Sequence, residues 1–356
     1  MIPPDWDSWL ATQGPQAGFC QTAHWAKMRE YAAGARPYVV EIAEGGVRRV
    51  AGLLLHEKPG GSMAGRVLRM FGDGTLTCTE GPVVAAGCET HFVRQWFGAV
   101  DDLARLIGAS KTSVTPRLWA NGRTDIGEDL VGAGWRVQPW ETALVDLTSD
   151  EAALLAGFDH AARKGVHKCE RAGLVVETCE SWDDYQTKFV APFEVSFGHE
   201  RTARRPPAAA RAIWDISIKS GCYRYYIARL PGGEVQATLG VYIFNRVATE
   251  IMSGRTPAGL ASGLPAQDLL HWTAVCAARR DGAQIFDLAG FSPAPANPKE
   301  EGIRRFKLKW GGRVVPCPRL VRSHSNFAAC VIGVARTIKS PFRRSGSSPG
   351  KTQSAR

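Results

Sequence analysis

A run of cations interleaved with aromatic and apolar side chains lies near the C-terminal end of the sequence, at residues 304–313, with Phe306 and Lys307 in its middle. Residues 302–356 carry 13 Lys and Arg residues and no Asp or Glu, whereas residues 1–301 carry 31 basic and 34 acidic residues. This asymmetry indicates an anionic partner at the C-terminal end: a nucleic acid, a phosphorylated substrate or a membrane surface. Because its aromatic residues can pack, we expect the segment 304–313 to be folded.

The final residues, 339–356, are rich in Ser, Gly and Pro and cannot form a packed core. We therefore expect a disordered basic tail, which either binds the anionic partner or is only solvated.

Other charged residues could also bind or process a substrate. Arg163 and Lys164 begin a basic cluster that continues to Arg171. The cluster either contacts phosphates or forms a solvated helix face. Asp287 ends a predicted strand, where it could accept a proton or orient a substrate amine. An aspartate at a strand end is also a common turn former.

Motifs for a covalent nucleophile, a bound dinucleotide or a metal are missing from the sequence. The segment Gly259–Gly263 has its serine one position too late for a nucleophile elbow. The segment Gly346–Thr352 is one residue short of a phosphate loop and lacks the flanking strand and helix. No Gly-x-Gly-x-x-Gly, Cys-x-x-Cys or His-Glu-x-x-His motif occurs. We expect reduced, mostly buried cysteines and no metal site.

Length and composition are those of a soluble globular protein with two domains. The chain has 356 residues, 44% hydrophobic and 22% charged, with a formal net charge of +10. These values exclude a mainly disordered, collagenous or disulfide-stapled chain. No run of about 18 apolar residues occurs, and Met1–Asp7 does not resemble a signal peptide. We expect a cytoplasmic protein, with the inner face of the membrane as a further place of action.

Two parts of the sequence repeat one order of predicted elements: a hairpin, a strand, a long helix and a strand. In the first part these are Tyr38–Ala43 with Val47–Leu55, a strand region at Arg66–Phe71 and Pro82–Ala85, residues 89–107, and Lys111–Thr115. In the second part they are Tyr223–Leu230 with Glu234–Phe244, Val247–Met252, Pro265–Arg279, and Gln284–Leu288. The shared order predicts a duplicated α/β fold.

The boundary between the two units is predicted near residue 147. Thr148–Glu151 begins the next helix with a capping residue and an acidic first turn. We therefore expect an N-terminal domain at residues 1–147 and a C-terminal domain at residues 148–317.

With these elements placed, the sequence resembles the Fem family of aminoacyl-tRNA-dependent peptidyltransferases. The similarity covers most of residues 19–315. It rests on six separated matches in the right order, which are Gln21–Lys27, Glu80–Val84, Glu141–Leu147, Arg163–Val176, Ile285–Phe291 and Gly302–Gly312. The resemblance implies two tandem GNAT-like domains, with mixed sheets flanked by helices. It also implies that residues 318–338 return to the first domain. No sustained heptad pattern occurs, so we expect no coiled-coil arm.

Members of this family transfer an amino acid from its tRNA to an amine of a peptidoglycan precursor. The resemblance therefore implies aminoacyl-tRNA and an anionic cell-envelope precursor, or another amine, as partners, and no cofactor or metal. Lys307 matches the family's Phe-Lys site, where a cation faces the ester or the RNA terminus. Phe306 would stack on the terminal adenine or pack in the core. Arg205 matches an arginine that could hold a phosphate or carboxylate, and Lys27 matches a lysine of the acceptor site.

Two other functions remain open. The first is a GNAT-type N-acyltransferase that uses acyl-coenzyme A, although the loop Ala261–Gln267 has one glycine and a proline where a pyrophosphate needs backbone donors. The second is an anion-binding module that docks on a membrane through an amphipathic helix at Phe327–Phe342. Burial of that helix face against the first domain is the competing interpretation.

Overall fold

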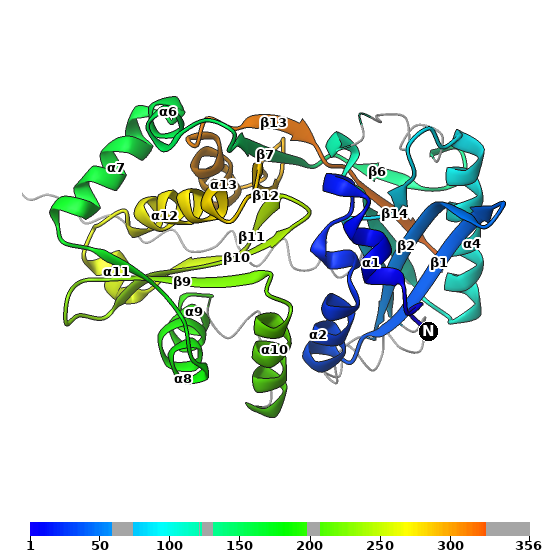
Figure 1. The fold of residues 1–356 in the computed structure, drawn as a ribbon, viewed down its shortest axis with the longest axis horizontal. Coiled ribbons are helices and arrows are strands. Elements are labelled where there is room, and N and C mark those ends of the chain that lie inside the picture. The colour runs from blue at the N-terminus through cyan, green and yellow to red at the C-terminus, as the bar shows by residue number, and fades with distance from the viewer. Residues whose placement is uncertain (59–73, 121, 123–130, 198–206, 325–356) are drawn as a thin grey trace, which may run out of the picture.

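The chain forms two mixed sheets, each flanked by helices (Figure 1). The computed structural model describes residues 1–58, 74–120, 122, 131–197 and 207–324. In spatial order the first sheet contains β1 (Arg36–Glu44), β2 (Val47–Glu57), β3 (Thr75–Thr79), β5 (Lys111–Thr115), β14 (Arg319–Ser323) and β6 (Arg136–Gln138), with β4 (Val83–Val84) paired to β2. The second sheet contains β13 (Arg313–Pro316), β7 (Glu141–Asp146), β12 (Ile285–Phe291), β11 (Val247–Arg255), β10 (Val235–Phe244), β9 (Tyr223–Arg229) and β8 (Val175–Thr178). The α/β class with two mixed sheets, expected from the sequence, is confirmed.

Helices cover both faces of each sheet (Figure 1). The first sheet packs against α4 (Thr90–Leu106) on its outer face, and against α1 (Trp6–Ala11) and α2 (Ala23–Ala33) on its inner face. One face of the second sheet packs against α6 (Glu151–Gly157), α7 (His160–Arg171), α12 (Ala266–Arg280) and α13 (Pro298–Leu308). Its other face packs against α8 (Trp182–Asp184), the π-helical turn η4 (Tyr185–Val190), α9 (Ala191–Phe197) and α10 (Pro207–Lys219). The remaining short helices are η1 (Gly14–Gln16), η2 (Phe19–Gln21), η3 (Leu118–Ala120) and α11 (Pro257–Ala261).

Sequence patterns explain the main elements. In α4 the residues Phe92, Trp96 and Val100 recur every fourth position and are buried against the first sheet. The β1–β2 hairpin turns at Gly45 and Gly46, whose positive φ angles of 57° and 79° favour glycine. The predicted helix near Asp125–Ala133 and the strand region at 66–71 lie largely or wholly outside the described residues.

The two sheets exchange one strand each. β7 follows β6 of the first sheet directly but pairs with β12 and β13 in the second sheet. β14 follows β13 of the second sheet but pairs with β5 and β6 in the first. The chain therefore crosses to the second sheet before Glu141, and the domain boundary expected near residue 147 stays a prediction. A buried strand pattern alone does not specify which sheet the strand joins. The tail at 339–356 and most of 318–338 lie outside the described residues.

An aromatic core joins the two halves of the chain. Phe19 from η2 packs between Tyr223 of β9 and Tyr242 of β10, with ring centroids 5.0 and 5.3 Å apart. All three side chains are buried. Burial of these three rings stabilises the contact between the N-terminal segment that contains η2 and the strands β9 and β10 of the second sheet.

Candidate functional site

The second sheet opens between two of its strands. The parallel strands β11 and β12 pair only from Val247 to Thr249, although β11 continues to Arg255. β11 has a bulge at Ile251 in its pairing with β10, and the β12–β7 register shifts between Asp287 and Gly290. Bulges bend a strand away from its neighbour. The two strands therefore diverge, and beyond Thr249 the edge of β11 that faces β12 has no strand partner among the described residues.

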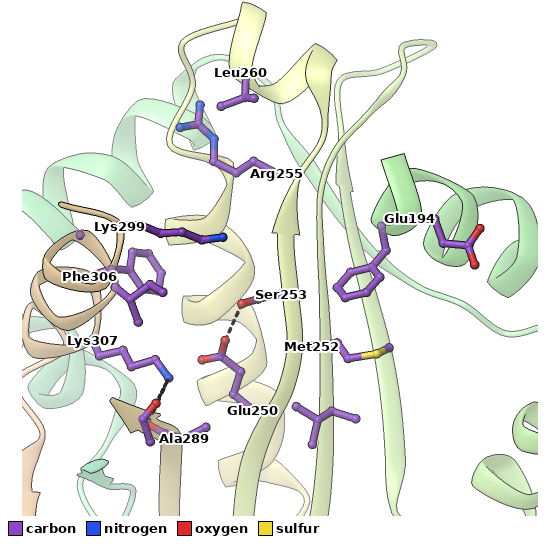
Figure 2. A pocket seen from close by; sticks show the side chains of 15 residues that line it. Glu194, Glu250, Met252, Ser253, Arg255, Leu260, Ala289, Lys299, Phe306 and Lys307 are labelled. Atoms are coloured by element: carbon purple, nitrogen blue, oxygen red, sulfur yellow. Dashed lines mark hydrogen bonds between the residues drawn. The ribbon is translucent and has the colours of Figure 1, made fainter. Parts of the chain in front are cut away.

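A cavity of about 940 Å³ lies in this opening (Figure 2). Its wall comes from β11, β12, α9, α11 and α13, and the residues are Phe193, Glu194, Glu250, Ile251, Met252, Ser253, Arg255, Leu260, Ala289, Gly290, Lys299, Gly302, Ile303, Phe306 and Lys307. The two residues predicted as catalytic, Phe306 and Lys307, thus line one cavity.

Lys307 is held at the floor of this cavity. α13 begins after Asn297, whose side chain accepts a hydrogen bond from the backbone of Glu300. Lys307 lies in the last turn of α13 and is 8% exposed. Its Nζ donates to the carbonyl oxygens of Ala289 at 3.1 Å and Gly290 at 3.3 Å. A buried ammonium ion fixed by backbone carbonyls is a ready positive charge for an anionic or polarised group.

Glu250 faces Lys307 across the same floor (Figure 2). Ser253 Oγ donates to Glu250 Oε1 at 2.5 Å, and His271 Nε2 lies 3.3 Å from Oε2. Nδ1 of the buried His271 lies 2.7 Å from the carbonyl oxygen of Gln267 and so must carry a proton. Burial raises the pKa of Glu250, but the hydrogen bond and charge of His271, together with the charge of Lys307, lower it to about 2. Glu250 is therefore a carboxylate at neutral pH.

Phe306 fills the space beside this pair. Its ring lies edge-on to His271, with centroids 5.0 Å apart, and Lys309 Nζ lies 4.4 Å from the Phe306 centroid. Phe306 is partly buried against the core and also lines the cavity. Both interpretations of Phe306, core packing and contact with a ligand, fit this position.

A second cavity, of about 280 Å³, adjoins the first where the two sheets meet. It is lined by Cys20, Thr79, Glu80, Thr115, Pro116, Arg117, Trp119, Trp140, Thr142, Tyr242, Thr249, Glu250, Ile251, Asp287, Ala289, Gly290, Cys317 and Arg319. The two cavities share four residues, which are Glu250, Ile251, Ala289 and Gly290. The two cavities therefore lie next to each other at these four residues.

Asp287 provides a carboxylate to the smaller cavity. It lies on β12 at the point where β11 and β12 diverge. Its Oδ1 accepts hydrogen bonds from Thr142 Oγ1 and from the backbone N–H of Ala289, the latter at 2.9 Å. Within the described residues no hydrogen bond is made to Oδ2. Burial raises the pKa of Asp287, while the charge of Arg117 opposes the rise. A raised pKa makes the carboxylate a better proton acceptor.

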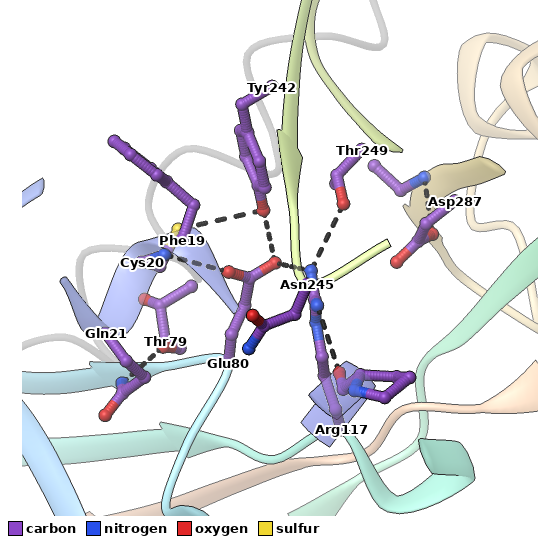
Figure 3. Close-up of polar contacts among 12 residues, drawn as sticks. Phe19, Cys20, Gln21, Thr79, Glu80, Arg117, Tyr242, Asn245, Thr249 and Asp287 are labelled. Atoms are coloured by element: carbon purple, nitrogen blue, oxygen red, sulfur yellow. Dashed lines mark hydrogen bonds and ion pairs between the residues drawn. The ribbon is translucent and has the colours of Figure 1, made fainter. Parts of the chain in front are cut away.

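Glu80 and Arg117 form a buried ion pair on the other side of this cavity (Figure 3). Glu80 follows β3 and Arg117 follows β5, so the first sheet delivers both from its strand ends. Glu80 also accepts hydrogen bonds from the Tyr242 hydroxyl and, at 2.9 Å, from the backbone of Cys20. Arg117 Nη2 donates to Thr249 Oγ1 at 3.1 Å. The network therefore links the strand ends of the first sheet to β10 and β11 of the second.

Other residues singled out in the sequence lie away from both cavities. Lys27 is exposed on α2 and pairs with Glu30 at 2.9 Å. Arg163 donates to the carbonyl oxygens of Ala156 and Phe158 at the end of α6, and Lys164 is exposed on α7.

In the described part of the chain, none of these three residues lines either cavity with Lys307 or Asp287. Arg205 lies outside the described residues.

Several site residues were not singled out from the sequence. Glu250 and His271 were missed, although a carboxylate within the predicted strand 247–252 was a visible signal. Arg117 and Tyr242 were missed because nothing in their neighbourhood marks a site until the two sheets are in contact. The sequence marks Glu80 only as part of the segment Glu80–Val84 that resembles the Fem family.

The beginning of α12 bears on the coenzyme A alternative. Pro265 caps the helix without a backbone donor, and Asp268 lies in the first turn. Asp268 is buried and pairs with Lys309 at 2.5 Å. The negative charge of Asp268 already interacts with the partial positive charge at the N-terminus of α12. A pyrophosphate would have to bind at the same helix end, so this carboxylate disfavours it.

In the part of the chain that the structure describes, no group of three potential metal ligands occurs. Over the same residues, none of the helices has both the length and the apolar character needed to span a bilayer. The membrane segment suggested at Phe327–Phe342 lies outside these residues.

Comparisons with known proteins identify the fold. A family model described as an acetyltransferase (GNAT) domain matches residues 157–315. The crystal structure of FemX is similar over 92% of this chain and 97% of its own, with 12% identity and a TM-score of 0.69. No curated protein sequence matches.

Two further solved structures have the same architecture. A tandem GNAT protein from the clavulanic acid biosynthesis pathway aligns over 89% of this chain and 94% of its own, with 15% identity and a TM-score of 0.55. The C-terminal domain of a putative lysylphosphatidylglycerol synthetase from Agrobacterium fabrum aligns over 93% and 97%, with 17% identity and a TM-score of 0.52. The chain therefore has a tandem GNAT-like fold, and the findings together support an acyltransferase.

Proposed function

We propose that this protein is an aminoacyltransferase, which moves an amino acid from its ester on tRNA to an amine of a peptidoglycan-precursor peptide or a similar acceptor. One observation carries the proposal: two cavities lie next to each other between diverging strands, one with a buried ammonium group and one with a carboxylate oxygen that accepts no hydrogen bond from the described residues. A reaction between two large substrates needs such a meeting point. The likeness to FemX over nearly the whole chain supports this type of donor and acceptor.

The larger cavity takes the donor in this proposal. Lys307, Lys299 and Arg255 place positive charge along its wall, which suits the phosphates of an RNA end. Phe306 lines the same wall and offers a ring on which a base can stack, worth roughly 1–3 kcal/mol. The ester carbonyl would then reach the shared wall beside Lys307.

The smaller cavity takes the acceptor amine. As the amine nitrogen attacks the ester carbonyl, a C–N bond forms and Asp287 Oδ2 accepts the proton that the nitrogen loses. The C–O bond of the ester then breaks, and the departing ribose oxygen receives the proton from Asp287. No covalent enzyme intermediate is required, which fits the lack of a nucleophile motif in the sequence.

The negative charge that develops on the ester carbonyl oxygen during the attack must be stabilised by hydrogen-bond donors. Beyond Thr249 the edge of β11 has no strand partner among the described residues, so its backbone N–H groups would be the donors in this proposal, and Lys307 would add a positive charge nearby. Preorganised donors of this kind are typically worth 10²–10³-fold in rate.

An acyl-coenzyme A donor is the alternative, and the match to the acetyltransferase (GNAT) domain model favours it. Pro265 and Asp268 at the start of α12 count against it, since they remove a donor and add a negative charge where a pyrophosphate would bind.

The test is to incubate the purified protein with radiolabelled aminoacyl-tRNAs, or with labelled acetyl-coenzyme A, and a stem peptide that has a free side-chain amine. We expect label in amide only from aminoacyl-tRNA, and its loss in Lys307→Ala but not in Lys219→Ala, which alters an exposed lysine on α10. Transfer from acetyl-coenzyme A alone would overturn the proposal in favour of the alternative.

A further inference from the structure

We propose that Glu250 binds the α-ammonium group of the aminoacyl donor, so that the site accepts α-amino esters and discriminates against acyl groups that lack this charge. The inference rests on the proposed function and adds a specificity-determining residue to it.

Glu250 lies where the reaction must take place. The donor and acceptor cavities share Glu250, Ile251, Ala289 and Gly290, and among these four Glu250 alone has a charged side chain. The reacting carbonyl carbon must lie at this shared wall, because both substrates have to reach it. In an aminoacyl ester the α-ammonium nitrogen is two bonds from that carbon. It therefore falls beside the Glu250 carboxylate.

The carboxylate has capacity for a further donor. Each of its oxygens can accept two hydrogen bonds. Oε1 accepts one from Ser253, and His271 Nε2 lies 3.3 Å from Oε2. Among the described residues Glu250 forms no ion pair with Lys or Arg, since Lys307 Nζ bonds to the backbone at Ala289 and Gly290 instead. An ammonium group offers three N–H donors, whereas an acetyl group would leave the remaining acceptor sites unpaired.

Glu250 is better suited to binding a cation than to moving a proton. Its pKa is lowered to about 2 because His271 and Lys307 outweigh the effect of burial. A carboxylate with so low a pKa is a weak base but stays charged throughout the neutral range. Proton transfer is left to Asp287, whose pKa burial raises.

The experiment measures binding of two stable donor mimics by calorimetry. One is 3′-alanylamino-3′-deoxyadenosine, which has a free α-amine and an amide in place of the ester, and the other is its N-acetyl derivative. We expect the wild type to bind the free amine about 10- to 100-fold more tightly, the range of a charge-assisted hydrogen bond. Glu250→Gln should remove most of this preference. Its amide keeps the shape of the side chain and its oxygen can still accept from Ser253, so the fold should survive, which a melting curve checks.

Glu194→Gln is the matched control. It removes a carboxylate from the larger cavity but not from the shared wall, and in Figure 2 the Glu194 carboxylate points away from Glu250. The preference for the free amine should persist in this variant.

Each result decides something. Equal binding of both mimics by the wild type, which needs no variant, overturns the role of Glu250 and leaves the aminoacyl donor intact. A preference that persists in Glu250→Gln overturns it as well. If neither mimic binds while acetyl-coenzyme A does, the proposed function fails together with the inference.

Discussion

The two sheets contain the same parallel strand pair and use it differently. In the first sheet β3 and β5 pair at all five positions from Thr75 to Thr79. In the second sheet β11 and β12 pair at three positions and then diverge. The bulge at Ile251 and the left-handed backbone of Ala289, with a φ of 59°, lie where the second pair opens. The duplicated fold therefore has one closed copy and one open copy.

The closed copy contributes residues to the smaller cavity from the ends of its strands. Glu80 follows β3 and Arg117 follows β5. Both lie against the open sheet, where they line the smaller cavity. Glu80 has a φ of 57°, which is uncommon for a residue other than glycine and is maintained by its ion pair and hydrogen bonds. We infer that the two sheets have different roles in the proposed reaction: the open sheet contains the reacting groups, and the closed sheet orients them.

The largest expected effect comes from Asp287 in the open sheet. Asp287→Asn keeps the shape and the hydrogen bond to Thr142 but cannot accept a proton, so the transfer rate should fall about 10²–10⁴-fold. Single-turnover measurements with aminoacyl-tRNA would check this, with donor affinity expected to stay within a few-fold. A rate within tenfold of the wild type would contradict the role of Asp287.

The rate of the wild type should also report the protonation of Asp287. Because burial raises its pKa, the rate should rise with pH to a midpoint above the ordinary aspartate value of 3.8. Arg117 lowers this pKa, so Arg117→Met should move the midpoint to higher pH. A midpoint that does not move would show that the two sheets are not electrostatically coupled at this site.

Lys307 comes next in expected effect. Removal of a buried positive charge beside the carbonyl should cost about 10²–10³-fold in rate. Lys307→Ala measured against Lys219→Ala separates this effect from a general loss of positive charge. Equal rates for the two variants would remove Lys307 from the mechanism and weaken the case that the open sheet contains the reacting groups.

The sequence predicted the repeated order of elements because its signals are local. The Gly45-Gly46 turn and the spacing of Phe92 and Trp96 define a hairpin and a helix without knowledge of the rest of the chain. The exchange of β7 and β14 between the sheets was only partly predictable. β14 could be assigned to the first sheet by family resemblance, but a short buried strand such as β7 fits either sheet equally well.

Of the residues that line the two cavities, the sequence singled out only those whose own segment contains visible chemistry. Lys307 and Phe306 stand in a basic, aromatic segment that is visible in the sequence, and Asp287 ends a predicted strand. Glu250 is brought to both cavities by the divergence of two strands, and Arg117 is brought to the smaller cavity by the contact of two sheets. Such long-range geometry leaves no mark in the local pattern of residues.

Arg117 also allows a stability test of the contact between the sheets. Arg117→Met leaves Glu80 buried without its partner, which should lower the free energy of unfolding by about 3–5 kcal/mol. The double variant Glu80→Gln with Arg117→Met should recover a large part of this loss. Denaturation in urea measures both values. A single variant as stable as the wild type would mean that this buried pair does not stabilise the fold where the sheets meet.

The smallest expected effect compares one glycine from each sheet. A Cβ atom on Gly52, in the closed sheet, would lie 2.7 Å from the Trp96 ring, and one on Gly290, in the open sheet, 1.9 Å from Trp140 Nε1. Trp96 is fully buried in a core, so Gly52→Ala should cost about 1–3 kcal/mol of stability through overpacking. Trp140 lines the smaller cavity, so Gly290→Ala should mainly reduce the transfer rate as the ring moves. Melting curves and rates for both variants, taken well below the melting temperature, check this. If Gly52→Ala slowed transfer as much as Gly290→Ala, closed and open sheets would not differ in function.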